Sequence, residues 1–406
     1  MTTRFVAIAV TVVVVGVSAL TMAEDDLAAA PADAWPLARG CLAGTGRSAA
    51  ELGLPLVEAW RRDIDNASFG AVPVIAAGTI YVGDLDGTFH ALALDTGTTR
   101  WSFTADAAGF PAAAAVSPDP ALPLVVVGDD AGTIRAFDVA TGAIRWRHET
   151  GGEISGGPTI LPSATGPRVL VGSQDASLTC LALDDGGVAW TFTSADQIRC
   201  APTVVHTADG DRVLIAGCDG RLHVIDAASG AERATVPIDG PTGTTPAAAG
   251  EVAYFGTEGG TFFAIDAGAE RILWQSRAAA GGQSYRSSAA LAGGLVIVGS
   301  RGRAVEAFTR ADGGRAWRRP MRGRVDASPV VVTARGGVAP AAAREVALVA
   351  DAAGRIAALD ARTGEPAWEF DAGGGFGGGA AVADGRVVFA SDDGRVWCFR
   401  SGDAAE

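Results

Sequence analysis

The chain contains 406 residues, of which 48% are hydrophobic and 19% are charged, and its formal net charge is −14. This composition supplies enough apolar surface for a packed core and argues against an intrinsically disordered chain. The acidic balance argues against a nucleic-acid partner, because binding to phosphates depends on clustered lysine and arginine side chains. The 55 glycines, without long helix-forming stretches, favour an all-β fold with many tight turns.

The first 23 residues have the pattern of a secretory signal peptide. Arg4 precedes an uncharged apolar run from Phe5 to Leu20, and small residues follow at Thr21 and Ala23, where a signal peptidase would cleave. The run is short for a membrane span, which needs about 20 apolar residues. We therefore expect an exported protein, periplasmic or extracellular, that has no transmembrane domain after cleavage. An uncleaved membrane anchor is the alternative.

Internal repeats follow this N-terminal segment. The sequence divides into a signal peptide of residues 1–23, a leader segment of residues 24–55, a repeat region of residues 56–400 and a C-terminal tail of residues 401–406. In the first repeat, Gly78, Asp86-Gly87 and Thr96-Gly97 separate four apolar runs. Asp-Gly and Thr-Gly pairs indicate tight turns, because glycine adopts positive φ without steric cost. Four short antiparallel strands in every 40–45 residues or so are typical of one propeller blade.

One aromatic position marks the end of each repeat, at intervals of 40 to 51 residues. Tryptophan fills this position in every repeat except one, where alanine stands instead. The eight positions are Trp60, Trp101, Trp146, Trp190, Ala234, Trp274, Trp317 and Trp368. Eight such positions predict eight blades.

The two ends of the repeat region supply complementary parts of one blade. The last repeat has three strand signals, of which the third ends at Phe399, and it lacks the fourth strand with its tryptophan. The segment Val57–Arg62 is an orphan strand that contains Trp60. Because ring closure removes exposed sheet edges, we predict that these parts pair. The expected fold is an all-β, eight-bladed β-propeller of four-stranded antiparallel blades, closed by the N-terminal strand.

The repeated motif resembles the PQQ-like propeller repeat. The motif joins a Gly-x-x-Asp-Gly turn to an Ala-hydrophobic-Asp segment, a Thr-Gly turn and a tryptophan, and Ala91–Trp101, Ala136–Trp146 and Ala358–Trp368 show it best. The leader Trp35–Gly40 is similar to the opening of many exported propellers of this family. Quinoprotein alcohol dehydrogenases and the BamB-like outer-membrane assembly scaffold share the repeat. The resemblance implies that each repeated tryptophan packs between neighbouring blades and donates its indole N–H to a backbone acceptor.

The resemblance leaves three functions open. Dehydrogenases of the family use an Asp base with Glu and Asn near a calcium ion, and often an adjacent cysteine pair. This sequence has one asparagine, Asn66, and no adjacent cysteines. We therefore expect a non-enzymatic, monomeric envelope scaffold with a protein partner, with no cofactor and with no catalytic, cofactor-binding or metal-binding residues. A PQQ-dependent oxidoreductase and an envelope sensor or polysaccharide-recognition module are the alternatives.

The candidate ligand site rests on position. By analogy with the family, the segments that lead into each blade ring one mouth of the central channel. Polar, charged and aromatic residues stand there at Ser155, Arg199, Tyr285, Arg286 and Asp326. Two arginines at a channel mouth can hold an anionic group or pair with Asp326.

Two of the five cysteines are candidates for a disulfide. Cys200 begins the first strand of its blade and Cys218 follows the second, so antiparallel pairing places both at one end of the blade. An exported protein can be oxidised, and this arrangement suits the short Cα separation that a disulfide needs. We predict a Cys200–Cys218 bridge, with two free buried thiols as the alternative.

Overall fold

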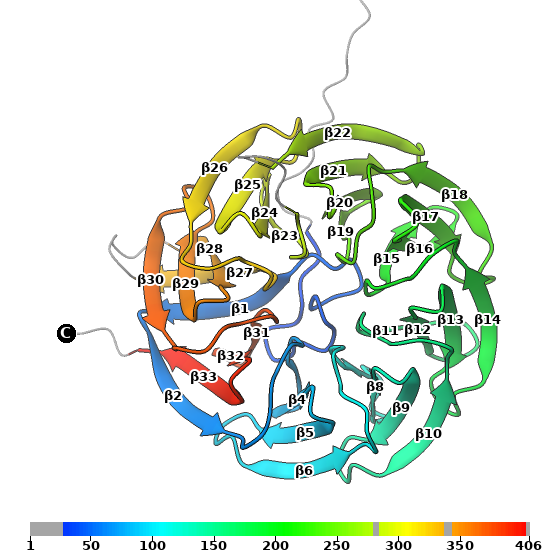
Figure 1. The fold of residues 1–406 in the computed structure, drawn as a ribbon, viewed down its shortest axis with the longest axis horizontal. Coiled ribbons are helices and arrows are strands. Elements are labelled where there is room, and N and C mark those ends of the chain that lie inside the picture. The colour runs from blue at the N-terminus through cyan, green and yellow to red at the C-terminus, as the bar shows by residue number, and fades with distance from the viewer. Residues whose placement is uncertain (1–26, 279–283, 337–342, 403–406) are drawn as a thin grey trace, which may run out of the picture.

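The computed structural model describes residues 27–278, 284–336 and 343–402, so the predicted signal peptide lies outside the described residues. Within these ranges the chain forms 33 strands and no helix. The strands are arranged as eight sheets in a ring (Figure 1), which confirms the predicted eight-bladed propeller.

Blade 1 shows how the repeat folds. Its strands pair antiparallel in chain order, from the channel outward: β3 (Val74–Ala76), β4 (Thr79–Gly83), β5 (Thr88–Ala93) and β6 (Thr99–Thr104). The turns between them contain Gly78, Gly87 and Gly97, which all have positive φ. Strand β4 is buried along its whole length, whereas β6 alternates between exposed and half-buried side chains. The middle of the blade therefore forms the core between neighbouring sheets, and the fourth strand faces solvent on one side.

The other blades repeat this order. Blades 2, 3 and 4 contain β7 (Ala115–Val116), β8 (Leu124–Gly128), β9 (Thr133–Asp138), β10 (Ile144–Glu149), β11 (Thr159–Leu161), β12 (Arg168–Gly172), β13 (Ser177–Ala182), β14 (Val188–Thr193), β15 (Thr203–Thr207), β16 (Gly210–Ala216), β17 (Arg221–Asp226) and β18 (Glu232–Pro237). Blades 5, 6 and 7 contain β19 (Ala247–Ala249), β20 (Val252–Gly256), β21 (Thr261–Asp266), β22 (Arg271–Arg277), β23 (Ala290–Ala292), β24 (Leu295–Ser300), β25 (Ala304–Thr309), β26 (Arg315–Pro320), β27 (Val330–Gly336), β28 (Arg344–Ala350), β29 (Arg355–Asp360) and β30 (Pro366–Asp371).

Blade 8 joins the two ends of the chain. It combines β31 (Ala381–Ala383), β32 (Arg386–Ala390) and β33 (Arg395–Ser401) with the N-terminal strand β2 (Leu56–Asp63). Strand β2 pairs antiparallel with β33 and places Trp60 opposite Cys398. The predicted closure is confirmed, because the N-terminal strand is the fourth strand of the last blade.

Blade 7 departs from the predicted four strands. A further strand, β1 (Arg47–Leu54), pairs parallel with β27, so this sheet has five strands. Strand β1 lies in the segment that the sequence analysis treats only as a leader. Its side chains alternate between buried and more exposed positions, as expected for a strand with one face against the core.

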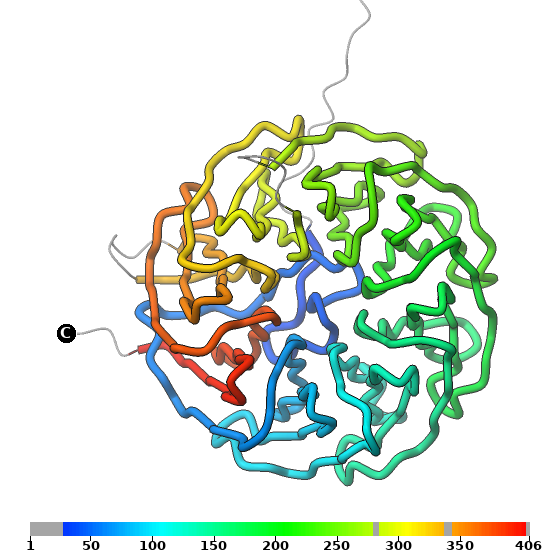
Figure 2. The backbone as a smooth tube through the Cα atoms, in the orientation of Figure 1, coloured from blue at the N-terminus to red at the C-terminus, as the bar shows by residue number. Residues whose placement is uncertain are grey.

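The preceding part of the leader lies inside the ring, where Figure 2 shows the N-terminal segment winding through the centre. Its backbone hydrogen bonds reach the innermost strands of most blades. Trp35 exchanges two hydrogen bonds with Ile75 of blade 1, and other leader carbonyls accept from the following blades. These further pairs are Ala32 with Asp384, Pro36 with Val116, Leu42 with Val204, Ala43 with Ala248, Thr45 with Leu291, and Gly46 with Val331. The leader therefore tethers seven blades to one continuous segment.

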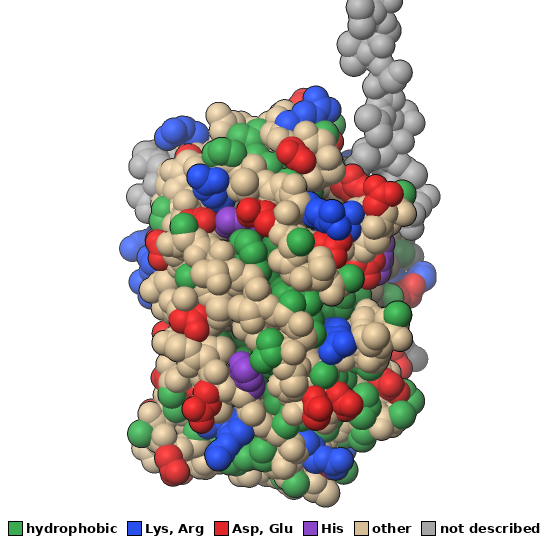
Figure 3. Space-filling view, turned by 90° about the vertical axis from the view of Figure 1, so that its right-hand side faces the viewer, with side chains coloured by type: hydrophobic (Ala, Val, Ile, Leu, Met, Phe, Trp, Pro, Cys, Tyr) green, Lys and Arg blue, Asp and Glu red, His purple; other side chains and the backbone are tan. Residues whose placement is uncertain are grey.

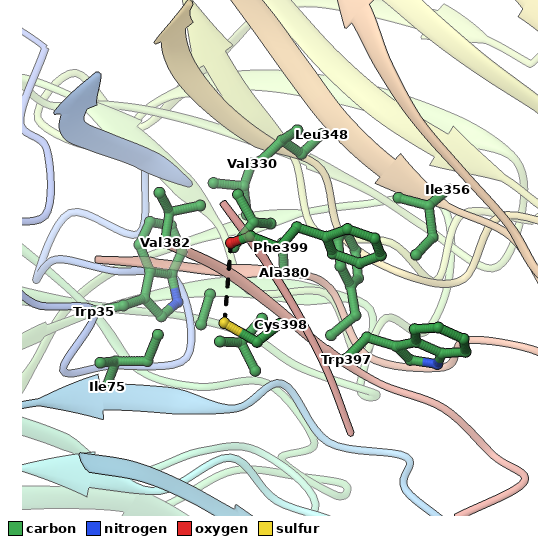
Figure 4. Close-up of a cluster of buried hydrophobic side chains, with 14 of the residues drawn as sticks. Trp35, Ile75, Val330, Leu348, Ile356, Ala380, Val382, Trp397, Cys398 and Phe399 are labelled. Carbon is green, nitrogen blue, oxygen red and sulfur yellow. Dashed lines mark hydrogen bonds between the residues drawn. The ribbon is translucent and has the colours of Figure 1, made fainter. Parts of the chain in front are cut away.

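Trp35 anchors this inner segment in the largest apolar cluster. Its side chain is fully buried and packs with residues of blades 1 and 8, including Ile75 and Val382 (Figure 4). The same cluster contains Cys398 and Phe399 of β33. The strand that closes the ring and the leader that fills its centre therefore share one core.

The repeated tryptophans join neighbouring blades. Six of them donate the indole N–H to a backbone carbonyl of the next blade at 2.7–3.1 Å: Trp60 to Leu94, Trp101 to Val139, Trp146 to Leu183, Trp190 to Ala227, Trp274 to Arg310, and Trp317 to Ala361. Each ring also lies against the glycine of the next blade's Thr-Gly-type turn. A Cβ atom added to that glycine would lie 2.5–2.7 Å from the ring. Trp368 packs edge-on against Phe399 instead.

Ring closure can be tested by N-terminal truncation. A chain that begins at Ile64 lacks β2, and we expect its melting temperature to fall at least 10 °C or so below that of a chain that begins at Pro55. The physical reason is that removal of β2 leaves β33 without its partner and removes the contact of Trp60 with blade 1. The chain from Pro55 is the matched control, since it also lacks the leader. Equal melting temperatures for the two chains would contradict closure by β2.

Candidate functional site

A cavity of about 150 Å³ lies at one mouth of the channel. The leader contributes Ala38 and Arg39, and the segments leading into the blades contribute the rest of the lining. Small residues, mostly glycine, alanine and serine, form much of this lining. The charged residues in the lining are Arg39, Arg199, Arg286 and Asp326. Three of these four side chains are positive, although the chain as a whole carries a formal charge of −14.

Arg39 is the buried charge of this cavity. Only 4% of the residue is exposed, and its Nη2 donates to the carbonyl oxygens of Ala289 at 2.7 Å and Pro329 at 2.8 Å. Its Nε and Nη1 have no hydrogen-bond partner among the described residues. Burial lowers the pKa of the guanidinium to about 10, so the group remains charged at neutral pH. Arg39 therefore holds the leader to blades 6 and 7 and keeps two donors unused.

The exposed arginines of the mouth share carboxylates. Glu258 lies 4.0 Å from Arg199 Nη1 and 3.4 Å from Arg286 Nε. Asp326 pairs with Arg301 at 3.2 Å and with Arg324 at 3.1 Å. Of the two alternatives that the sequence left open, pairing of Arg199 and Arg286 with Asp326 is therefore not the one formed. Each carboxylate instead lies between two arginines.

Two other residues of the predicted mouth differ in their surroundings. Ser155 lines the cavity and accepts a hydrogen bond from Gln174 Nε2 at 3.2 Å. Tyr285 does not line it, because its side chain is fully buried and its hydroxyl donates to Glu306 at 2.8 Å. The placement of Tyr285 at the mouth was wrong, because its ring lies in the apolar core between blades 5 and 6, edge-on against Phe262. Its neighbour Arg286 takes the position that faces the channel.

The two candidate cysteines are free thiols in the structure, so the predicted bridge is not formed there. Arg199 Nε donates to Cys218 Sγ at 3.0 Å, which ties this thiol to the mouth. Burial raises the pKa of the Cys200 thiol to about 12, so it is protonated at neutral pH. A protonated, buried thiol is a poor nucleophile.

The residues of the mouth do not match a quinone–calcium site. Calcium takes six to eight or so oxygen ligands, largely from carboxylates and amides. In the described part of the chain no group of three or more His, Cys, Asp or Glu side chains is placed to hold a metal ion. The sole asparagine, Asn66, is not among the residues that line the mouth. This donor set does not fit the metal that the dehydrogenases of the fold use.

Sequence reasoning did not identify Arg39, which lines the mouth cavity, or the three residues that pair with its charged lining, Glu258, Arg301 and Arg324. Arg39 falls within the Trp35–Gly40 motif, which the sequence marked only as a leader. The other three follow or precede strand ends without a distinctive motif, so their convergence depends on the ring. Away from the mouth, on the side of the ring shown in Figure 3, acidic and arginine side chains are intermixed.

Comparisons with known proteins bear on the fold and the family. The sequence model described as "Outer membrane protein assembly factor BamB" matches residues 57–190, 130–208, 203–323 and 301–405. No curated protein matches the chain. Among the described residues, none forms a helix long and apolar enough to cross a membrane.

Three solved structures are similar in fold, each at no more than 20% identity. BamB from Moraxella catarrhalis has 20% identity and a TM-score of 0.67, over 85% of this chain and 99% of its own. Quinohemoprotein alcohol dehydrogenase from Comamonas testosteroni has 15% identity and a TM-score of 0.70, over 92% of this chain and 82% of its own. The computationally designed protein Ika8 has 16% identity and a TM-score of 0.66, over 84% of this chain and 99% of its own.

The role of Arg39 in holding the leader can be measured by substitution. Arg39→Ala leaves two buried carbonyl oxygens without a donor, while it also removes a desolvated charge. We expect a net loss of about 1–3 kcal/mol in the free energy of unfolding, measured by denaturant titration. Arg199→Ala, at the more exposed edge of the same cavity, is the control and should change stability by less than about 0.5 kcal/mol. A more stable Arg39→Ala protein would show that the buried charge costs more than its hydrogen bonds return.

Proposed function

The chain belongs to the family described as outer membrane protein assembly factor BamB, and from this premise we propose that it is an exported, non-enzymatic scaffold. In this proposal the channel mouth holds an acidic side chain of an envelope protein partner. The observation that carries the proposal is Arg39, a buried guanidinium that lines the mouth cavity with two unused donors.

The size and chemistry of the cavity support an acidic side chain as the bound group. A carboxylate accepts charge-assisted hydrogen bonds from a guanidinium, and Nε and Nη1 of Arg39 have no hydrogen-bond partner among the described residues. Arg199 and Arg286 add positive charge around the same cavity of about 150 Å³. An apolar cavity of about 150 Å³ accepts a molecule as small as benzene, so this volume suits one side chain.

The rigid frame supports a scaffold. The mouth residues stand on segments that the leader ties to seven blades by backbone hydrogen bonds. Loops on a rigid ring can present a fixed pattern of side chains to a partner without a large ordering cost. The signal-like N-terminal segment and the family description both favour a role in the cell envelope.

A quinoprotein oxidoreductase is the second candidate, because a quinohemoprotein alcohol dehydrogenase shares the fold. Against it, the described residues offer no cluster of metal-binding side chains. An envelope sensor or polysaccharide-recognition module would use the same mouth for a different ligand. The residues that line the mouth include no aromatic side chain on which a sugar could stack.

Site-specific photo-crosslinking tests the proposed partner site. A photoreactive residue replaces Arg286 at the mouth or, as the control, Arg145 on the outer strand of blade 2, where the side chain is 59% exposed. In envelopes of the producing cell, we expect a discrete protein adduct from position 286 and none from position 145. The adduct should disappear when Arg39→Gln is added, because glutamine carries no positive charge to hold a carboxylate.

Two results would contradict the proposal. One is the same set of adducts from both positions, or no adduct from position 286. The other is oxidation of an alcohol by the purified protein after addition of PQQ and calcium, followed with a redox dye, which would favour the oxidoreductase. Fractionation of the same cells tests export separately, since it requires neither the mouth nor the partner.

A further inference from the structure

One interface between blades lacks the tryptophan that six others share. Ala234 of β18 stands opposite Val224 of β17, and the register shifts directly after this pair. Trp190 in blade 3 and Trp274 in blade 5 occupy the same register, also followed by the shift. Ala234 therefore occupies the structural position of the repeated tryptophan, without its indole ring.

The glycine that receives the ring is missing at the same interface. In the turn after β21, the position equivalent to Gly230 and Gly313 is Glu270, which has a positive φ of 56°. At the six tryptophan interfaces, a Cβ atom on that glycine would lie within 2.7 Å of the indole ring. A tryptophan and a Cβ are therefore incompatible there, and this interface has lost both halves of the contact.

A cavity of about 230 Å³ occupies the space between blades 4 and 5. Its apolar lining includes Val205, Val224, Ala234 and Ala267. An apolar cavity of about 150 Å³ is large enough to bind benzene, so this larger one accommodates a bicyclic ring. The shape of this cavity follows from the fold, because the other blades hold an indole ring at the position that Ala234 occupies here.

The cavity also retains the acceptor for a ring N–H. The carbonyl of Ala267 is equivalent to that of Ala227, which accepts from Trp190 at 3.1 Å, and to that of Arg310, which accepts from Trp274 at 2.8 Å. No hydrogen bond from the described residues reaches the Ala267 carbonyl oxygen. An aromatic ring with an N–H donor would satisfy it as the other indoles satisfy theirs.

The charged residues around the cavity favour a cation. Arg212 and Arg233 both line it, and both pair with Asp226, at 3.3 Å and 2.8 Å. The carboxylates in the lining are those of Asp209, Glu251 and Glu270, and none of them forms an ion pair with a described residue. An amino group on the ligand would therefore meet carboxylates whose charge is not already compensated.

We propose that the cavity between blades 4 and 5 is a binding site for a small indole-type aromatic amine. Its ring takes the place of the missing tryptophan, its ring N–H donates to the Ala267 carbonyl, and its amino group faces Glu251 and Glu270. The site is distinct from the cavity at the channel mouth, since the two cavities share no lining residue. It is independent of the proposed scaffold function.

Calorimetric titration of the purified protein with tryptamine tests the site. We expect saturable binding of one tryptamine per chain. Methylation of the ring nitrogen should weaken binding about tenfold, because it leaves the buried carbonyl without a donor. N-acetyltryptophanamide and indole-3-acetate, which lack the cationic amine, should also bind at least about tenfold more weakly, since a hydrogen-bonded charge contributes more than a neutral group.

Three variants locate the site. Ala234→Leu fills the cavity with a side chain smaller than tryptophan, and Glu251→Gln removes one carboxylate, so both should weaken tryptamine binding. Glu58→Gln, on the exposed face of β2, is the matched charge control and should bind as the unmodified chain does. The proposal is overturned if the unmodified chain does not bind tryptamine at millimolar concentration, or if Ala234→Leu, folded by circular dichroism, binds it unchanged.

Discussion

The contact between a tryptophan of one blade and a glycine of the next organises the ring. The glycine adopts positive φ in the turn between the third and fourth strands of its blade, and it must lack a Cβ because the indole ring occupies that space. The ring in turn donates its N–H to the carbonyl three residues before that glycine. One contact therefore fixes turn geometry, blade spacing and burial together, which explains why the same two residue types return at six of the eight interfaces between blades.

The N-terminal segment extends this organisation to the centre. The blades alone would leave a channel lined by the short inner strands, and the leader fills it by bonding to these strands one after another. Strands β1 and β2 then continue into blades 7 and 8, so one segment both fills and closes the ring. This arrangement buries the charged Arg39 at the mouth, which is unfavourable unless its donors are satisfied. Its two unpaired donors are the most direct chemical reason to expect a ligand there.

The blades and their closure could be predicted because they depend on local patterns that repeat. Thr-Gly turns, apolar runs and the position of Trp60 relative to Phe399 carry that information within each unit. The path of the leader could not be predicted in the same way, because it occurs once and its hydrogen bonds use backbone groups that any sequence has. Tyr285 was misplaced for a related reason: the side of the chain that a residue faces depends on the neighbouring blade. Ala234 was visible as an exception in the sequence, but its loss coincides with Glu270 and a cavity only in the folded ring.

A double-mutant cycle at the exceptional interface tests the role of the tryptophan–glycine contact most directly. Ala234→Trp alone should be accommodated poorly, because the Glu270 Cβ occupies the space of the ring. Together with Glu270→Gly, the new indole can pack and donate to the Ala267 carbonyl. We predict that the double variant is more stable than the sum of the two single changes in the free energy of unfolding would give, by at least about 1 kcal/mol. This value lies within the range of coupling between touching residues. Additivity within about 0.5 kcal/mol would contradict the account, because it would show that ring and glycine do not act as one contact.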